Sequence, residues 1–589
     1  MAPQPGLDLG GRYGLRIEQF ADLMSRRVLE VLLVASEYDA FAFEEDGHLT
    51  ERVSKEYREL DLNMRYAPRF VRARDGAQAL QWLSDRRFDL VVTTARLADM
   101  ELAAFCRAVK DRLPELPIGV VAAHAWDLAR LDGVREPGGA DLILLWEGDP
   151  KTLLALIKLV EDRWNADRDI LEGGVQAIVL VEDEVRSLSA LLPRLFSEVM
   201  LQTGRLADEG LNLSHRLLRA RARPKLLLAR TFEEALALYE RYAANVLGLV
   251  SDCSFPRGGA ADPEAGCALV EAVRARDPFV PVLLMSSEAD YAAKAAALRV
   301  AFVHKEVPTA FDDVRRHLIE DFGFGDFVFR MPDGAEVARA RDLRELVPCL
   351  ERVPEESLRF HADRNHFSRW LKARTELEVA AMLRPLRPTD FADLEAIRKY
   401  LIGTLTYYLR YLQRHATTDF DPARYDAFVA FSRIAAGSLG GKGRGLAFMH
   451  KLLAGERPGM EGVEVAIPQT AVIATDAYEE FVETNRLHDV IGGAGDGLPD
   501  CEVLDRFRRG RFPGRRRGDF AAFLQQVRDP IAVRSSGILE DSAYQPFAGV
   551  YATVMLPNNH PSLDVRLAQL LEAVKVVYAS ASLRAAREG

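Results

Sequence analysis

Residues 177–184 read AIVLVEDE, five apolar residues followed directly by three acids. A short apolar run rich in β-branched residues predicts a strand that is buried on both faces of a sheet. Helix-like patterns at Thr231 to Tyr242 and Gly266 to Arg276 separate further runs of this kind. Those runs are KLLLART (225–231), VLGLVSD (246–252), VPVLLMSS (280–287) and AFVHKE (301–306). Strands alternating with helices predict a doubly wound, five-stranded parallel α/β sheet, which we expect at residues 174–322.

The same alternation of strands and helices occurs earlier in the chain. The strand candidates there are VLEVLLVAS (28–36), FDLVVTT (88–94), PIGVVAA (117–123) and ADLILLW (140–146). The economical interpretation is two tandem copies of one five-stranded unit. We expect the first copy at residues 27–168, after a weakly patterned tail at 1–26.

Polar side chains follow the strands of the second copy. Glu182 and Asp183 come after the first strand, Asp252 after the third, Ser286 after the fourth and Lys305 after the fifth. Functional groups gather at the carboxyl ends of strands in a doubly wound sheet. Carboxylates from two strand ends suit Mg²⁺, and a lysine with a hydroxyl opposite could hold the oxygens of a phosphoryl group.

This order and spacing resemble a response-regulator receiver domain, which has a flavodoxin-like fold. The resemblance implies that Glu182, Asp183 and Asp252 bind Mg²⁺ and that Asp252 accepts a phosphoryl group. It also implies that Ser286 and Lys305 respond to that group and that a sensor histidine kinase is the partner. The alternative is that each acid only caps a helix or faces water. The stretch from Glu184 to Lys225 is longer than one receiver helix and loop need.

The first copy lacks the residues for this chemistry. The position that matches the acceptor is Thr94, the lysine position holds Trp146, and the hydroxyl position holds Ala122 or Ala123. We therefore expect a pseudo-receiver used for docking or dimerisation, which would allow a homodimer through the receivers.

The remaining sequence divides into two regions that differ in pattern and composition. Residues 323–418 read as a helical connector, and residues 419–589 are mixed and glycine-rich. In GSLGGKGRGLAFMHKLL (437–453), glycines let the backbone approach a phosphate, and the helix start is expected to present free N–H groups. IAVRSSGILED (531–541) adds an arginine at a strand end and two acids. The candidate binding residues are Gly440, Gly441, Lys442, Gly443, Arg534, Glu540 and Asp541.

These two motifs, with IPQTAVIATDAYEEFV (467–482) between them, resemble the N-terminal nucleotide-binding domain of phosphoenolpyruvate synthase and pyruvate phosphate dikinase. The resemblance implies part of an ATP-grasp fold at residues 419–589. It implies ATP as ligand, with Lys442 and Arg534 on its phosphates and Glu540 and Asp541 near the nucleotide or its metal. The family's phosphohistidine and pyruvate-binding domains are not recognised before Gly589. We therefore expect any binding of pyruvate or phosphoenolpyruvate to depend on domains that are absent here.

Three functions are compatible with these patterns. The leading one is a two-component signalling protein whose phosphorylated receiver controls an ATP-binding, kinase-like module. The second is the front part of a pyruvate, water dikinase-like enzyme, an ATP-dependent phosphotransferase. The third is a non-catalytic ATP-binding scaffold. A reading frame that continues past Gly589 would favour the second function.

Composition excludes other classes of protein. The net charge of -11 gives no global reason to expect nucleic acid as a partner. The five cysteines form no CxxC pair, so neither a cysteine-rich zinc site nor a disulfide framework is indicated. Apolar runs fall short of the roughly 18 residues that span a bilayer, and we expect a cytoplasmic protein. Seven arginines at 506–517 could bind a polyanion, but we interpret them as a solvated loop and expect no nucleic-acid partner. His361 and His366 are interpreted as surface or connector residues rather than metal ligands.

Overall fold

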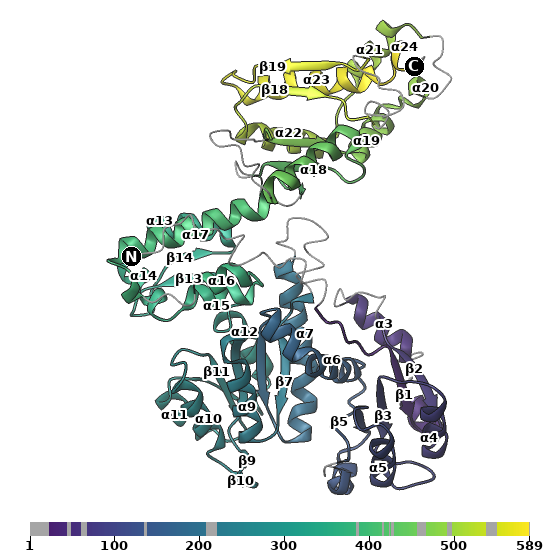
Figure 1. The fold of residues 1–589 in the computed structure, drawn as a ribbon, viewed down its shortest axis with the longest axis vertical. Helices are drawn as coiled ribbons and strands as arrows, with labels where there is room; N and C mark the ends of the chain where they lie inside the picture. The colour runs from purple at the N-terminus through teal and green to yellow at the C-terminus, as the bar shows by residue number, and fades with distance from the viewer. Residues whose placement is uncertain are drawn as a thin grey trace. The chain divides into compact units, whose positions relative to one another are not determined.

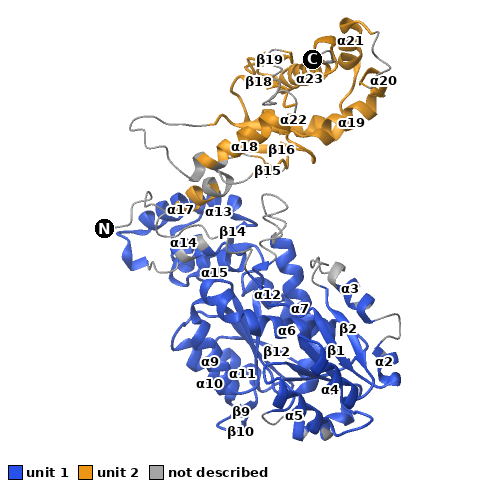
Figure 2. Ribbon diagram, turned by 45° about the vertical axis from the view of Figure 1, so that its right-hand side comes forward, with its two compact units in different colours: residues 1–210, 214–403 blue, residues 211–213, 404–589 orange. Residues whose placement is uncertain are grey.

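The computed structural model describes most of the chain in two compact units. One unit comprises residues 1–210 and 214–403, and the other comprises 211–213 and 404–589 (Figure 2). Each unit has a hydrophobic core of its own. The described residues are 23–43, 49–59, 67–134, 138–207, 221–383, 388–414, 417–422, 425, 429–455, 467–491, 498–537 and 550–587.

The first unit begins with a five-stranded parallel sheet of order β2-β1-β3-β4-β5. Its strands are β1 (Glu30–Val34), β2 (Arg69–Ala73), β3 (Leu90–Thr94), β4 (Ile118–Ala122) and β5 (Leu142–Leu145). The associated helices are α2 (Glu37–Phe43), α3 (Leu49–Glu59), α4 (Gly76–Asp85), α5 (Leu102–Arg112) and α6 (Lys151–Ala166). Every residue of β3, β4 and β5 is buried, as expected where helices cover both faces of a parallel sheet.

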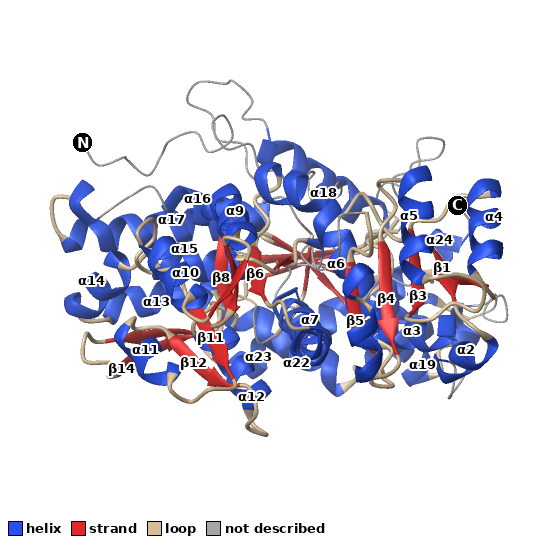
Figure 3. Cartoon of the chain, turned by 90° about the horizontal axis from the view of Figure 1, so that it is seen from below, coloured by secondary structure: helices blue, strands red, loops and turns tan. Residues whose placement is uncertain are grey.

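A second parallel sheet follows, with the order β12-β11-β8-β6-β7. Its strands are β6 (Ala177–Val181), β7 (Lys225–Ala229), β8 (Val246–Asp252), β11 (Val282–Ser286) and β12 (Ala301–His304). Its helices are α7 (Val185–Ala207), α9 (Phe232–Tyr242), α10 (Ala265–Arg274), α11 (Tyr291–Ala297) and α12 (Ala310–Glu320). Counted within each copy, both orders are 2-1-3-4-5, the flavodoxin-like arrangement (Figures 1 and 3). The predicted tandem flavodoxin-like folds are confirmed.

A small antiparallel hairpin, β9 (Phe255–Arg257) and β10 (Ala260–Asp262), follows β8. Gly258 and Gly259 form its turn with φ angles of 61° and 83°, a conformation that favours glycine. The hairpin lies between the end of β8 and the start of α10, and the sequence patterns did not indicate it.

A buried ionic network joins the two copies. Asp162 of α6 accepts two hydrogen bonds from the Arg223 guanidinium, at 2.6 and 2.8 Å. Lys225 Nζ, at the start of β7, lies 2.6 Å from Asp169 Oδ2. The Lys225, Asp162 and Asp169 side chains are completely buried, so each charge depends on its partners in the other copy. The first copy is therefore docked on the second within one unit.

The rest of the first unit starts with another hairpin and continues in helices. Phe327 and Phe329 from this hairpin pack against Phe367 and Trp370. The sequence patterns suggested only helices in this region, and the hairpin is an addition to that expectation. The elements are β13 (Phe327–Arg330), β14 (Glu336–Ala340), α13 (Leu343–Arg352), α14 (Glu355–Asp363), α15 (His366–Ala373), α16 (Leu377–Leu383) and α17 (Leu394–Arg414), whose end continues into the second unit.

The second unit contains a small parallel sheet of order β15-β16-β17 and an antiparallel pair, β18 with β19. Its strands are β15 (Thr418–Asp419), β16 (Phe431–Ile434), β17 (Thr470–Ile473), β18 (Ile531–Arg534) and β19 (Thr553–Leu556). Its helices are α18 (Gly440–Gly455), α19 (Thr475–Asn485), α20 (His488–Ile491), α21 (Asp500–Arg509), α22 (Gly514–Gln526), α23 (Leu563–Ser580) and α24 (Arg584–Arg587). Phe481, Phe507 and Phe512 belong to the apolar core beneath these helices.

Among the described residues, no helix combines the length and the apolar character needed to cross a membrane.

Candidate functional site

An acidic pocket lies at the carboxyl edge of the second sheet. Glu182 and Asp183 follow β6, and Asp252 is the last residue of the neighbouring strand β8. One carboxylate oxygen from each of the three lies within 4.8 Å of the others. Among the described residues, this is the only such group of three metal-ligating side chains. The sheet thus brings together the three acids that the sequence predicted.

Lys305, directly after β12, is placed at the centre of this pocket. Its Nζ lies 2.8 Å from Glu182 Oε2 and 2.9 Å from Asp252 Oδ2, and its side chain is 12% exposed. Burial lowers the pKa of Lys305, but the attraction of the two carboxylates outweighs it and raises this pKa overall. Lys305 therefore stays charged and holds the two acids close together.

Burial dominates the ionisation of the paired acids. It raises the pKa of Glu182 to about 7, an effect that Lys305 opposes and Asp252 reinforces. Burial also raises the pKa of Asp183. Three carboxyl groups face one ammonium group, so acidic groups outnumber basic ones in the pocket. Its donors are all carboxylate oxygens, the ligands that Mg²⁺ prefers, and the residues present fit that ion.

The other groups around Asp252 are positioned by the backbone. Asp252 Oδ1 accepts a hydrogen bond of 2.7 Å from the Cys253 N–H group. Ser286 ends β11, the next strand, and its Oγ accepts a 3.1 Å hydrogen bond from the Glu288 N–H group. The Lys305 N–H group donates to the Ser286 carbonyl at 2.9 Å. Ser286 and Lys305 thus lie side by side on neighbouring strands at the edge that carries Asp252.

The corresponding edge of the first sheet has different groups. Thr94 ends β3, and its Oγ1 donates a 2.8 Å hydrogen bond to the Arg96 carbonyl. Trp146, directly after β5, meets Phe43 edge to face with ring centroids 4.9 Å apart. Here a hydroxyl and an indole stand where the second copy has a carboxylate and an ammonium group.

The glycine-rich loop of the second unit is closed by a residue that the sequence analysis did not single out. Gly440 has a φ of 71°, and a Cβ there would lie 1.5 Å from the Ser536 carbonyl oxygen. The Gly441 N–H group donates to that carbonyl at 3.1 Å, and the Gly443 N–H group donates to Ser536 Oγ at 2.8 Å. The expectation of free N–H groups at this helix start is wrong for these two, because Ser536 already accepts from both.

The two predicted motifs therefore meet through Ser536. Lys442 lies half-buried in the first turn of α18, and Arg534 is exposed at the end of β18, two residues before Ser536. The predicted acids Glu540 and Asp541 lie outside the described residues.

The arginine-rich segment is only partly the loop that the sequence suggested. Residues 510–513 connect the end of α21 to the start of α22, and the remaining arginines lie on these two helices. Several of its arginines form ion pairs, such as Arg508 with Glu572 at 2.8 Å and Arg516 with Glu480 at 2.7 Å. Phe507 is buried in the core and cannot stack on a base. These features fit a structural segment better than a polyanion site.

Comparison with known proteins gives one family match. Residues 436–587 match the family model described as pyruvate phosphate dikinase, AMP/ATP-binding domain. This match confirms the resemblance predicted for the C-terminal region. No curated protein matches the chain.

Several solved structures are similar to parts of the chain. The signal receiver domain of an HD domain-containing protein from Pseudomonas fluorescens Pf-5 is 22% identical, over 24% of this chain and 94% of that one, with a TM-score of 0.19. The chemotaxis response regulator CheY4 of Vibrio cholerae is 20% identical, over 23% and 98%, with a TM-score of 0.18. NtrX from Brucella abortus in complex with ATP is 14% identical, over 63% and 84%, with a TM-score of 0.20.

The chain thus joins two flavodoxin-like repeats, the second with an acidic pocket, to a region similar to the AMP/ATP-binding domain of pyruvate phosphate dikinase.

Proposed function

We propose that this protein is a two-component signalling protein in which Asp252 accepts a phosphoryl group and thereby controls the ATP-binding region. The observation that carries the proposal is the contact of Lys305 with both Glu182 and Asp252, at 2.8 and 2.9 Å. It joins an acceptor carboxylate, a charged ammonium group and a second acid at one sheet edge. A purely structural ion pair would not need the third acid, Asp183, in the same cluster.

The proposed reaction is phosphoryl transfer from a phosphohistidine of a sensor histidine kinase. A carboxylate oxygen of Asp252 attacks phosphorus, a P–O bond forms, and the P–N bond to the imidazole breaks. The imidazole leaves with the electron pair of that bond and takes up a proton. Glu182, Asp183 and Asp252 would hold Mg²⁺, which when bound offsets the negative charge of the phosphoryl oxygens.

The phosphoryl group would then change the partners of Lys305. Its oxygens are stronger acceptors than a single carboxylate and would draw the ammonium group away from Glu182. Ser286, on the adjoining strand end, can donate its hydroxyl hydrogen to another phosphoryl oxygen. These two residues would report phosphorylation to the elements that carry them, β11 and β12.

In the second unit we propose ATP as the ligand, with Lys442 and Arg534 as the phosphate contacts. The family match supports this ligand. Ser536 now accepts from the amides of Gly441 and Gly443, so a phosphate that binds at the helix start must replace Ser536 there. Any catalysis by this region would be phosphoryl transfer from ATP.

The test measures ATP affinity of the full chain by calorimetry, before and after treatment with acetyl phosphate and MgCl₂. We expect the dissociation constant for ATP to change at least threefold on phosphorylation, and not to change in Asp252→Asn. Asp290→Asn removes an exposed acid outside the pocket and should behave like the wild type. An unchanged affinity in wild-type protein that carries the phosphoryl group would refute the proposed control.

A further inference from the structure

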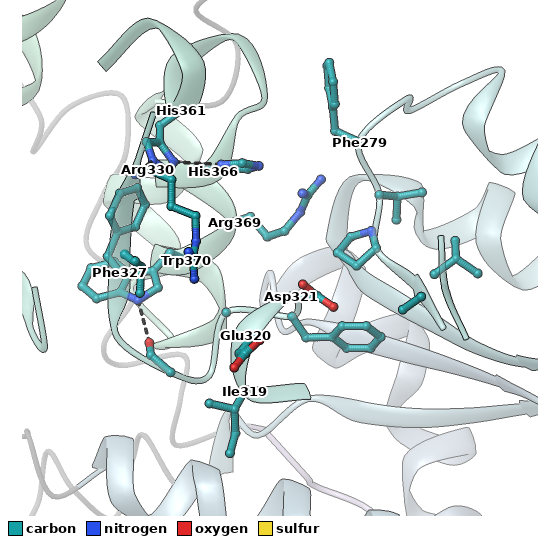
Figure 4. Close-up of a pocket in the computed structure, with 18 of the residues that line it drawn as sticks. Phe279, Ile319, Glu320, Asp321, Phe327, Arg330, His361, His366, Arg369 and Trp370 are labelled. Atoms are coloured by element: carbon teal, nitrogen blue, oxygen red, sulfur yellow. Dashed lines mark hydrogen bonds between the residues drawn. The ribbon is translucent and has the colours of Figure 1, made fainter. Parts of the chain in front are cut away.

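A cavity of about 500 Å³ lies at the end of the second sheet where β11 begins, the edge opposite the acidic pocket (Figure 4). One wall contains the start of β11 and the end of α12, and the other contains β13, α14 and α15. Strand β11 begins in this wall at Val282 and ends at Ser286, beside Asp252. The volume of the cavity is in the usual range for sites that bind small molecules.

The wall on the second repeat carries two arginines, Arg274 and Arg299. Arg274 donates to the backbone carbonyls of Leu298 and Arg299, and its buried Nε has no hydrogen-bond partner. Neither Arg274 nor Arg299 forms an ion pair with any described residue. Burial lowers the pKa of Arg274, and the positive charge of nearby Arg299 lowers it further.

The opposite wall carries a pair of histidines, His361 buried and His366 partly exposed, with defined proton positions. The Arg330 N–H group donates to His361 Nε2 at 2.8 Å, so that nitrogen carries a lone pair. The two Nδ1 atoms of His361 and His366 are 2.9 Å apart, and the His361 proton must lie between them. His366 therefore keeps its own proton on Nε2. Figure 4 shows its ring reaching from α15 into the space between the walls, with Arg369 below it.

Both histidines lie in the region interpreted as a connector, but His361 is buried and not at the surface. Burial lowers the pKa of His361 to about 4 and that of His366 to about 3, so both rings are neutral near pH 7. A neutral His366 offers one hydrogen-bond donor to the cavity and adds no charge.

The residues that line the cavity carry more positive than negative charge. Three acids line it: Glu320, Asp321, which is hydrogen-bonded to His317 at 2.7 Å, and Asp326, which lies 3.4 Å from Arg339. The arginines in the lining are Arg274, Arg299, Arg330, Arg339 and Arg369. Of these, Arg369 lies 3.8 Å from Asp277. Phe279 stands at the rim with 42% of its surface exposed and offers a flat apolar face.

We propose that this cavity binds a small organic anion whose phosphate or carboxylate group is held by Arg274 and Arg299 and whose flat apolar part lies against Phe279. Guanidinium groups bind both kinds of anion through paired N–H donors. Arg369 and the Nε2–H group of His366 can donate to the same ligand from the other wall. A molecule held by both walls would fix the hairpin and helices of residues 327–373 against the second repeat.

The test is calorimetric titration of the full chain with phenyl phosphate and with benzoate, which present the two anionic groups on the same ring. We expect at least one probe to bind, and its identity assigns the class of anion. Inorganic phosphate, which lacks the ring, should bind at least tenfold more weakly than phenyl phosphate if phosphate is the preferred group.

Variants locate the site. Arg299→Gln, at an exposed position, and Arg274→Gln should each weaken binding at least tenfold. Arg276→Gln removes a neighbouring arginine that pairs with Glu240 outside the cavity. This control variant should bind the probe as the wild type does. Failure of both probes to bind at millimolar concentration, or unchanged binding in both cavity variants, would overturn the proposal.

Discussion

Lys305 Nζ lies 2.9 Å from Asp252 Oδ2, and the same ammonium group is shared with Glu182. The contact ties the fifth strand of the repeat to its first and third strands at one edge. The contact also keeps the Asp252 carboxylate paired with Lys305 until a more highly charged group, such as a phosphoryl group, takes up the ammonium group.

Replacing this lysine should destabilise the second repeat. Lys305→Met leaves Glu182 and Asp252 facing each other, and we expect a loss of ~2–3 kcal/mol because the position is partly exposed. MgCl₂ should restore part of the loss, since a divalent cation can replace the ammonium charge. Thermal unfolding with and without MgCl₂ measures both effects. Lys294→Met, at an exposed lysine on α11, is the control and should unfold like the wild type. Equal midpoints for Lys305→Met and the control would contradict this role.

The glycine-rich loop allows a test with two glycines of the same helix. Gly440→Ala puts a methyl group into the Ser536 carbonyl and strains a left-handed backbone, so the loop should open. Opening releases the Gly441 and Gly443 amides but also displaces the neighbouring Lys442, and because the loss of that charged contact should dominate, we expect ATP affinity to fall. Gly445→Ala has no heavy atom within 4 Å of the added carbon and should stabilise α18 by about 1 kcal/mol. Melting temperature and ATP titration distinguish the two variants. If both have the same affinity for ATP, the close approach of Ser536 has no role in binding.

Much of this arrangement follows from local sequence, and some of it does not. The runs AIVLV and VLGLVSD predict β6 and β8 because buried parallel strands need continuous apolar residues. Their terminal acids meet because parallel strands end at a common edge. The contact of Gly440 with Ser536 joins residues about a hundred positions apart, and no local pattern reports such a contact.

The histidine pair shows why spacing alone can mislead. His361 and His366 are five residues apart, which does not place them on one face of a single helix. Asn365, with a φ of 55°, ends one helix and starts the next, and the change of direction brings the two rings together. A left-handed asparagine is a turn signal, but it does not by itself specify where the rings will meet.

The ATP contacts make a prediction about affinity. Lys442→Ala and Arg534→Ala should each weaken ATP binding by roughly tenfold or more, because a lost hydrogen bond to a charged group costs about 1.5–3 kcal/mol. Arg528→Ala, at an exposed arginine before β18, should have no effect. Equal dissociation constants for the wild type and all three variants would exclude this loop as the ATP site.

The buried histidines should make stability depend on pH. Their pKa values in the folded chain are about 4 and about 3, whereas both titrate near 6.5 when unfolded. The unfolded state then binds more protons at acidic pH, so the stabilisation is complete above about pH 6.5 and declines as the pH falls towards 4. At about 1.4 kcal/mol per pH unit, the loss from His361 reaches about 3 kcal/mol. Melting temperatures from pH 7 to 4 should fall less steeply in His366→Asn than in the wild type. The exposed His488→Asn should keep the wild-type slope, and a wild-type slope in His366→Asn would refute the assignment.

The most direct test of the account is to locate the phosphoryl group after treatment of the full chain with acetyl phosphate and MgCl₂. Borohydride reduces an aspartyl phosphate to an alcohol, so the modified peptide can be identified by mass spectrometry. We predict a single modified aspartate, Asp252, no modification of residues 88–100 around Thr94, and no labelling of Asp252→Asn. Labelling that persists in Asp252→Asn, or that falls on the first repeat, would contradict the account.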